Sequence, residues 1–286
     1  MSEKILVVGS GFLGSNIAQE FKEHTVTQTN LSKTMNGSHI LNIIDKEKVM
    51  GCFQKFKPTI VINCAANTDV DFLEKNADIA YSINSEGVKN LAIASEKFKA
   101  RLIHISTDGI FDGKHGMYSE KDNPNPINIY AKSKLLGEKN VIENCSDHVI
   151  LRTNFYGNFP KGKSLFNYIL TKLQKKEQIV GFSDVFFTPL EVSNLSCLIS
   201  EITFSNHVGI LNLSSNELMS KYQFCCNIAK IFNFNSSLIK KGSIEDMGFI
   251  AKRPKNTTLD NTKSMNIIKS KIVPLTDWLL KIKDAP

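Results

Sequence analysis

The stretch that decides the fold is KILVVGSGFLG, residues 4–14. Its first five residues are mostly large and apolar, which is typical of a buried strand. Gly9, Gly11 and Gly14 then follow the pattern G-x-G-x-x-G, and residues 11–22 show the apolar spacing of a helix. Glycines at such a turn let the backbone approach a pyrophosphate, whose charge the helix N-terminus stabilises. The stretch therefore predicts a dinucleotide-binding βαβ unit, although a tight turn without a ligand would share the pattern.

Strands and helices continue to alternate along the first half of the chain. Such alternation implies right-handed crossovers and a parallel sheet that is covered on both faces. We therefore predict an α/β fold, a Rossmann-like doubly wound parallel sheet with a smaller C-terminal α/β substrate domain. Further strands are expected at residues 24–29, 59–64, 101–106 and 148–153, and helices at residues 46–56 and 77–98 and around Lys134.

The second half of the chain alternates less regularly and shows no linker or change of composition. We predict an NAD(P)-binding Rossmann domain over residues 1–155, completed by about residues 190–215. Residues 156–286 would form mainly the substrate-binding domain, with an interleaved boundary. Helices are expected here at residues 164–175, 192–203 and 221–232, and a strand at residues 209–213.

Composition excludes several classes of protein. The 286 residues are 42% hydrophobic, and no apolar run approaches the roughly 20 residues of a membrane span. The N-terminus lacks a signal-peptide layout, so we expect a cytoplasmic protein. The six cysteines show no metal-ligand spacing, so no metal site is predicted. The net charge of +7 comes from dispersed basic residues, which favours a polyanionic small molecule over nucleic acid or a membrane.

The stretch after the second expected strand bears on the choice of cofactor. Sites that prefer NAD place an Asp or Glu about 20 residues after the glycine motif, against the ribose hydroxyls. Residues 24–44 contain no acidic residue, and Asn30 and Lys33 lie where a 2′-phosphate would be accommodated. We therefore expect NADPH, with NADH as the alternative, and count Asn30 and Lys33 among the candidate cofactor-binding residues.

Tyr130 and Lys134 lie one helical turn apart, just after a loop that contains two prolines. Residues four apart face the same way, and a lysine beside a tyrosine favours the phenolate and lowers the phenol pKa. This arrangement makes an acid suited to neutral pH, although Tyr-x-x-x-Lys also occurs on solvated surfaces. Ligands of a doubly wound sheet bind at the carboxyl ends of its strands. The fourth expected strand ends at Thr107 and Asp108, so a hydroxyl, a phenol and an ammonium would meet there.

Six segments together resemble a known family. The chain is similar to extended short-chain dehydrogenase/reductases, and most closely to the dTDP-4-dehydrorhamnose reductase family, over nearly its whole length. The segments are INCAANTDVD (62–71), IHISTDGIFDG (103–113), NPINIYAKSKLLGE (125–138), LRTNFYG (151–157), FTPLEVSNLS (187–196) and RPKNTTLDNTK (253–263).

The resemblance implies roles for individual residues. Tyr130 would donate a proton to the reduced carbonyl, Lys134 would lower the pKa of Tyr130 and hold the nicotinamide ribose, and Thr107 would hydrogen-bond the carbonyl oxygen. Asp108 matches a substrate-contact position. The remaining matches are to cofactor segments: Gly11, Phe12 and Leu13 around the pyrophosphate, Asn42 and Ile43 beside the adenine, and Ala65, Ala66 and Asn67 over the cofactor.

The chain also departs from the family. The glycine loop is one residue shorter than usual, Phe155 stands where the reductase has a Trp against the substrate, and Gly109 replaces a common aromatic residue. Phe155 is therefore expected to shape the sugar pocket. Arg253, which precedes Pro254 and so lies in an extended segment, is expected to bind the diphosphate, because Arg pairs with phosphate in a bidentate way.

The expected activity is NAD(P)H-dependent reduction of a nucleotide-linked 4-keto-6-deoxy sugar, with a nucleotide-diphosphate sugar as the ligand. An epimerase or dehydratase of the same superfamily stays open because Asp108 lies beside the catalytic hydroxyl. A non-catalytic regulatory subunit, like the relative of this fold that regulates methionine adenosyltransferase, is a third reading. Retention of Thr107, Tyr130 and Lys134 favours an enzyme. A homodimer is also left open.

Overall fold

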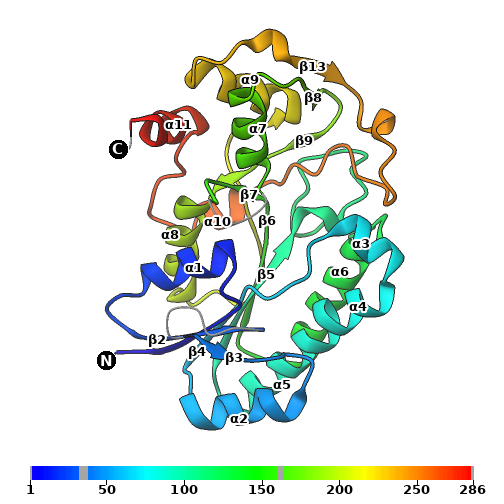
Figure 1. Cartoon of the computed structure of the whole chain (residues 1–286). Coiled ribbons are helices and arrows are strands. Elements are labelled where there is room, and N and C mark those ends of the chain that lie inside the picture. Colours follow the sequence, from blue (N-terminus) through cyan, green and yellow to red (C-terminus); the bar gives the residue numbers. More distant parts are fainter. Residues whose placement is uncertain (1, 32–37, 160–163, 285–286) are drawn as a thin grey trace.

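The computed structural model describes residues 2–31, 38–159 and 164–284 (Figure 1). Its centre is a seven-stranded sheet in which every neighbouring pair is parallel, in the order β11-β6-β5-β4-β1-β2-β3. This confirms the predicted doubly wound α/β fold. The strands are β1 (Lys4–Val8), β2 (Thr25–Asn30), β3 (His39–Ile40), β4 (Ile60–Asn63), β5 (Arg101–Thr107), β6 (His148–Thr153) and β11 (Gly209–Leu213).

Helices cover both faces of this sheet (Figure 1). Successive side chains of a strand point to opposite faces, so Ile5 and Val7 of β1 join one core and Leu6 and Val8 join the other. The first core lies under α1 (Phe12–Glu20) and α8 (Val192–Thr203). The second lies under α2 (Lys46–Phe56), α5 (Gly87–Phe98) and α6 (Ile129–Asn144).

The helix expected at residues 77–98 is built from three segments. α4 (Ala77–Tyr81) and α5 are joined by a π-helical turn, η1 (Ser82–Glu86), which packs against α6. A Cβ at Gly137 of α6 would lie 2.3 Å from the Asn84 carbonyl oxygen, so this approach requires glycine. A short helix, α3 (Val70–Lys75), precedes them and was not predicted; the Asp69 side chain caps it by accepting from Phe72 N at 3.1 Å.

The second half adds a third core above the carboxyl edge of the sheet (Figure 1). Trp278 packs edge-on against Tyr156 and Phe166, with ring centroids 5.0 and 5.1 Å away. This core is formed by α7 (Leu165–Gln174), α9 (Lys221–Ile231), α11 (Leu275–Lys283) and the parallel pair β8 (Ile179–Phe182) and β13 (Ile239–Gly242). The remaining elements are β7 (Phe155–Tyr156), β9 (Phe186–Phe187), β10 (Leu190–Glu191), β12 (Met219–Ser220), α10 (Thr262–Met265), η2 (Asp108–Ile110), η3 (Ser236–Leu238) and η4 (Ile244–Met247).

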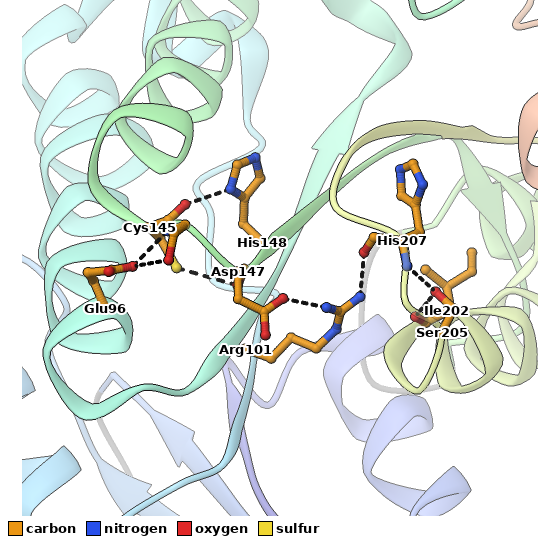
Figure 2. A network of polar contacts seen from close by, with 9 residues as sticks. Glu96, Arg101, Cys145, Asp147, His148, Ile202, Ser205 and His207 are labelled. Atoms are coloured by element: carbon orange, nitrogen blue, oxygen red, sulfur yellow. Dashed lines mark hydrogen bonds and ion pairs between the residues drawn. The ribbon is translucent and has the colours of Figure 1, made fainter.

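The opposite, amino edge of the sheet is closed by a polar network (Figure 2). Arg101, the first residue of β5, forms an ion pair with Asp147 and donates to the His207 carbonyl oxygen at 2.5 Å. His148 Nδ1 donates to the Cys145 carbonyl oxygen at 2.6 Å. These contacts hold together the loops before β6 and β11, so their role is structural.

Candidate active site

Three adjoining cavities follow the carboxyl ends of the strands. Thr68 lines all three, which makes them one continuous cleft. The adenosine-side cavity is about 560 Å³ and is lined by Gly9, Asn30, Asn42, Ile43, Ala65, Ala66 and Asn67, among others. The central cavity is about 440 Å³ and is lined by Gly11, Phe12, Leu13, Gly14, Lys134, Phe155 and their neighbours. The outer cavity is about 440 Å³ and is lined by Asp108, Lys221, Arg253, Thr257 and a largely apolar wall.

The glycine turn has the geometry that a pyrophosphate requires. Gly9 has φ +96°, and a Cβ there would lie 2.9 Å from the Ala65 backbone nitrogen. A Cβ at Gly14 would lie 1.9 Å from the Gly9 carbonyl oxygen. At Gly11, by contrast, a Cβ would meet no described atom within 4 Å, so the backbone faces open space. The first turn of α1 has no acidic residue and Gly11 provides no side-chain cap, so its N–H groups fit an anionic ligand.

Hydrogen bonds hold Asn42 and Ile43, the segment expected beside the adenine, in place. Asn42 Oδ1 accepts from Ile44 N at 3.1 Å, and Asn90 Nδ2 donates to the Ile43 carbonyl oxygen at 2.9 Å. Asn30, at the end of β2, lines the same cavity and its Oδ1 accepts from Leu31 N at 2.7 Å. Lys33 lies outside the described residues. The other predicted cofactor residues therefore all line the adenosine-side or the central cavity.

Thr107 and Asp108 lie at the end of β5, on the wall of the outer cavity. Thr107 Oγ1 donates to Asp108 Oδ1 at 3.1 Å and accepts from Gly109 N at 3.0 Å. Asp108 Oδ2 also accepts from Asn154 Nδ2 at 2.9 Å and from Thr257 Oγ1 at 2.7 Å. Burial raises the pKa of Asp108, while these donors and Lys221 oppose the rise. The carboxyl group thus fixes the Thr107 side chain from the substrate side.

Tyr130 and Lys134 lie in the first turns of α6, which Asn128 caps by accepting from Ala131 N at 2.9 Å. Tyr130 lines both the central and the outer cavity. Burial raises the pKa of Tyr130 to about 12, and its interaction with the Thr107 side chain only partly offsets this rise. Lys134 is not among the groups that change the pKa of Tyr130 here, so its expected effect on Tyr130 stays a prediction.

Lys134 is buried, with 2% exposure, beneath the central cavity. Its Nζ donates to the Ile105 carbonyl oxygen at 2.7 Å. Burial lowers the pKa of Lys134 to about 8, and the charges of Glu138 and Cys64 oppose this change. The ammonium is thus directed at the backbone of β5, which explains why it does not stabilise the Tyr130 phenolate here.

A buried ion pair supports the residues beneath the central cavity. Arg152 Nη2 lies 2.7 Å from Glu138 Oε2, and Arg152 Nε donates to both Glu138 oxygens at 3.2 Å. Ser106 Oγ donates to Glu138 Oε1 at 2.5 Å. The pair therefore joins the ends of β5 and β6 to α6, one helical turn beyond Lys134. The sequence analysis did not detect it, although Arg152 and Glu138 both lie within the family segments.

Of two further predicted substrate residues, Arg253 lines the outer cavity and Phe155 does not. Phe155, expected in the sugar pocket, lines the central cavity instead, because it begins β7 and packs with the core under α1; its ring centroid is 6.1 Å from that of Phe12. Arg253 does line the outer cavity, but its Nη2 lies 3.1 Å from Asp71 Oδ1 of α3. Arg253 also lies over the Phe249 ring, 5.1 Å from its centroid.

Other cavity residues were missed by sequence reasoning. Asn154 and Thr257 could have been suspected, because both fall in the segments that carry the family resemblance. Lys221 could not, because nothing in its sequence context distinguishes it from a surface lysine at a helix start. Within the described ranges, no group of three His, Cys, Asp or Glu residues is placed to hold a metal ion. No described helix is both long and apolar enough to cross a membrane.

Comparison with known proteins agrees with this geometry. The family model described as the RmlD substrate binding domain matches residues 3–285. The chain belongs to this family. Membership confirms the resemblance to the dTDP-4-dehydrorhamnose reductases that the sequence segments carry.

Three known proteins show how far this similarity extends. Methionine adenosyltransferase 2 subunit beta from Xenopus laevis is 32% identical over 274 residues, covering 92% of this chain and 81% of that protein. The spore coat polysaccharide biosynthesis protein SpsK from Bacillus subtilis is 32% identical over 261 residues, covering 90% and 89%. The crystal structure of dTDP-4-dehydrorhamnose reductase from Bacillus anthracis in complex with NADP is 29% identical, with a TM-score of 0.90 and 98% of each chain covered.

Proposed function

We propose that this protein is an NADPH-dependent reductase of a nucleotide-linked 4-keto-6-deoxy sugar. The observation that carries the proposal is the convergence of Thr107, Tyr130 and Lys134 where the central and outer cavities meet. A nicotinamide in the central cavity and a keto sugar in the outer cavity would face each other across these three side chains. Family membership and the NADP-containing reductase from Bacillus anthracis support the same reaction class.

Each of the three side chains has a task in this reaction. The bound nicotinamide would supply hydride to the ketone carbon. Thr107 would donate its hydroxyl proton to the ketone oxygen in place of Asp108, while Gly109 N continues to donate to the hydroxyl oxygen. Tyr130 would donate its phenolic proton to that oxygen. Lys134, beneath the central cavity, would hold the cofactor ribose and turn its charge toward Tyr130.

We also propose that earlier and later parts of the chain bind different ligands. Residues 1–155, completed by β11, would bind the cofactor, because they form the sheet and the glycine turn. The later segments would bind the sugar nucleotide, since α7, β8, α9 and the Arg253 loop supply the apolar wall of the outer cavity. A cytoplasmic location fits a reaction that consumes NADPH.

A regulatory subunit is the second candidate, because methionine adenosyltransferase 2 subunit beta is among the relatives. Such a protein would bind a dinucleotide without turnover. An epimerase or dehydratase is a third, and it would convert a nucleotide sugar without net consumption of NADPH. Only the reductase would consume NADPH, and only the two kinds of enzyme would convert the sugar, so cofactor oxidation and sugar conversion together separate the three candidates.

The test is a panel of nucleotide-linked keto sugars, with NADPH oxidation followed by absorbance and products identified by NMR. Tyr130→Phe should lower turnover by roughly 10²–10⁴-fold while NADPH still binds, because only the proton donor is removed. Tyr81→Phe, at the end of α4, is the matched control and should leave turnover unchanged. Activity of Tyr130→Phe within threefold of the unaltered protein would remove Tyr130 from the mechanism. NADPH binding without turnover of any sugar would favour the regulatory reading.

A further inference from the structure

Lys221 places a cation in the wall of the outer cavity. It is the first residue of α9, and its Nζ lies 3.2 Å from the centroid of the Phe187 ring. The aromatic face thus holds the ammonium in one place. Much of the surrounding wall is apolar, including Ile179, Val185 and Cys225. An amine held among apolar groups is costly unless a partner compensates its charge.

The described chain does not supply that partner directly. No described carboxylate oxygen lies within 4.0 Å of Lys221 Nζ. Among charged groups, Asp108 has the largest effect on the Lys221 amine, but the Asp108 oxygens already accept from Thr107, Asn154 and Thr257. Arg253, the other cation of this cavity, differs because Asp71 lies 3.1 Å from it. Burial lowers the pKa of Lys221 to about 8, so the amine is still mostly protonated at neutral pH.

The position of Lys221 indicates which part of a ligand it would meet. Its charge acts on Asp108, which is adjacent in sequence to Thr107 and hydrogen-bonded to it. Thr107 in turn interacts with Tyr130. Lys221 lines the same cavity as Thr107 and Tyr130, so it shares that cavity with the reacting groups, whereas Arg253 is already ion-paired with Asp71 of α3.

We propose that Lys221 binds an anionic oxygen of the substrate in the outer cavity. This inference rests on the proposed function for the identity of the ligand as a nucleotide sugar. Two sources share this chemistry: the diphosphate, which the proposed 4-keto-6-deoxy substrate carries, and a carboxylate on the sugar ring, which would make the substrate a uronate in place of a 6-deoxy sugar. Either would make Lys221 a specificity-determining residue, since a neutral side chain there would leave the anion without its donor.

The experiment measures binding by titration calorimetry to the unaltered protein, Lys221→Met and Lys230→Met. Methionine keeps an apolar side chain against Phe187, and a thermal melt would verify folding. Lys230 is exposed at the other end of α9 and provides the matched control. The probes are inorganic pyrophosphate, UDP, UDP-glucose and UDP-glucuronate. Loss of one charge-assisted hydrogen bond should weaken binding by roughly ten- to a hundredfold.

The two sources give different patterns. Weakening of pyrophosphate and UDP by Lys221→Met assigns Lys221 to the diphosphate, whereas selective weakening of UDP-glucuronate over UDP-glucose assigns it to a sugar carboxylate. Affinities of all probes within twofold in Lys221→Met, or no anion binding by the unaltered protein, would overturn the proposal. Absence of NADPH oxidation with every sugar, combined with a Lys221-dependent affinity for pyrophosphate, would instead refute the proposed function and leave the anion site standing.

Discussion

Replacement of Lys134 by Met should make the free energy of unfolding less dependent on pH in the alkaline range. Lys134 is buried at 2% exposure, and burial lowers its pKa from 10.5 to about 8. In the unfolded chain the amine keeps its proton up to about pH 10.4. Between these two values the unfolded state binds more protons than the native state, so stability rises with pH. Below about pH 8 the buried Lys134 ammonium lowers the stability of the native state.

The size of this effect follows from the two pKa values. Linkage gives the native state a gain of about 2 kcal/mol from this group between about pH 7 and about pH 9.5. Met cannot titrate, so Lys134→Met should lack this gain. Its absolute stability also includes the loss of the hydrogen bond to the Ile105 carbonyl oxygen. The pH dependence separates the two, because that loss does not follow the proton.

The measurement is urea unfolding of three proteins at several values across this pH range. Lys132→Met is the matched control, because Lys132 lies two residues away on α6 and is exposed. The difference in unfolding free energy between the unaltered protein and Lys134→Met should grow in favour of the unaltered protein as pH rises. It should stay constant for Lys132→Met. A constant difference for Lys134→Met would refute the assignment of a buried, easily deprotonated amine.

Two further predictions concern the ligands. Values of kcat/KM should be higher with NADPH than with NADH, because residues 24–44 carry no carboxylate to repel a 2′-phosphate; a clear preference for NADH would contradict that reading. Arg253→Ala should raise KM for the nucleotide sugar by roughly ten- to a hundredfold and leave NADPH affinity unchanged. Arg253→Lys should recover only part of the loss, since lysine keeps the charge without the bidentate geometry. An unchanged KM in folded Arg253→Ala would show that this residue does not bind substrate.

Local patterns predicted the first half of the fold well because each element there is decided by short-range chemistry. The apolar run before Gly9 could only be buried, and the pairing of β1 with β2 and β4 follows from it. The glycine spacing predicted a turn whose close approach to Ala65 the structure contains. The structure has Tyr130 and Lys134 in one helix, as predicted from the two prolines before them and the helical pattern after them, and Asn128 caps that helix.

The misses have a different origin, since they depend on contacts between distant segments. The two-residue strands β9 and β12 exist only because they pair with each other, and a two-residue run has no periodicity to detect. Phe155 was assigned to the sugar pocket from its position in the family pattern, but its orientation is set by packing near Phe12. The partner of Arg253, Asp71, lies far away in the sequence, so no spacing rule could indicate it.

The pKa of Tyr130 determines the protonation state in which the proposed reaction begins. A hydroxyl acid that reduces a ketone must begin protonated, whereas the reverse oxidation needs the phenolate as base. Burial holds the pKa of Tyr130 near 12, so almost all of the enzyme carries the proton at neutral pH. Lys134 points away toward Ile105 and does not oppose this. A ligand that drew the Lys134 ammonium toward Tyr130 would make the phenol a stronger acid only after the cleft is filled. The site would therefore release its proton when the ketone is in place, as reduction requires, while the ratio of reduced to oxidised cofactor sets the net direction.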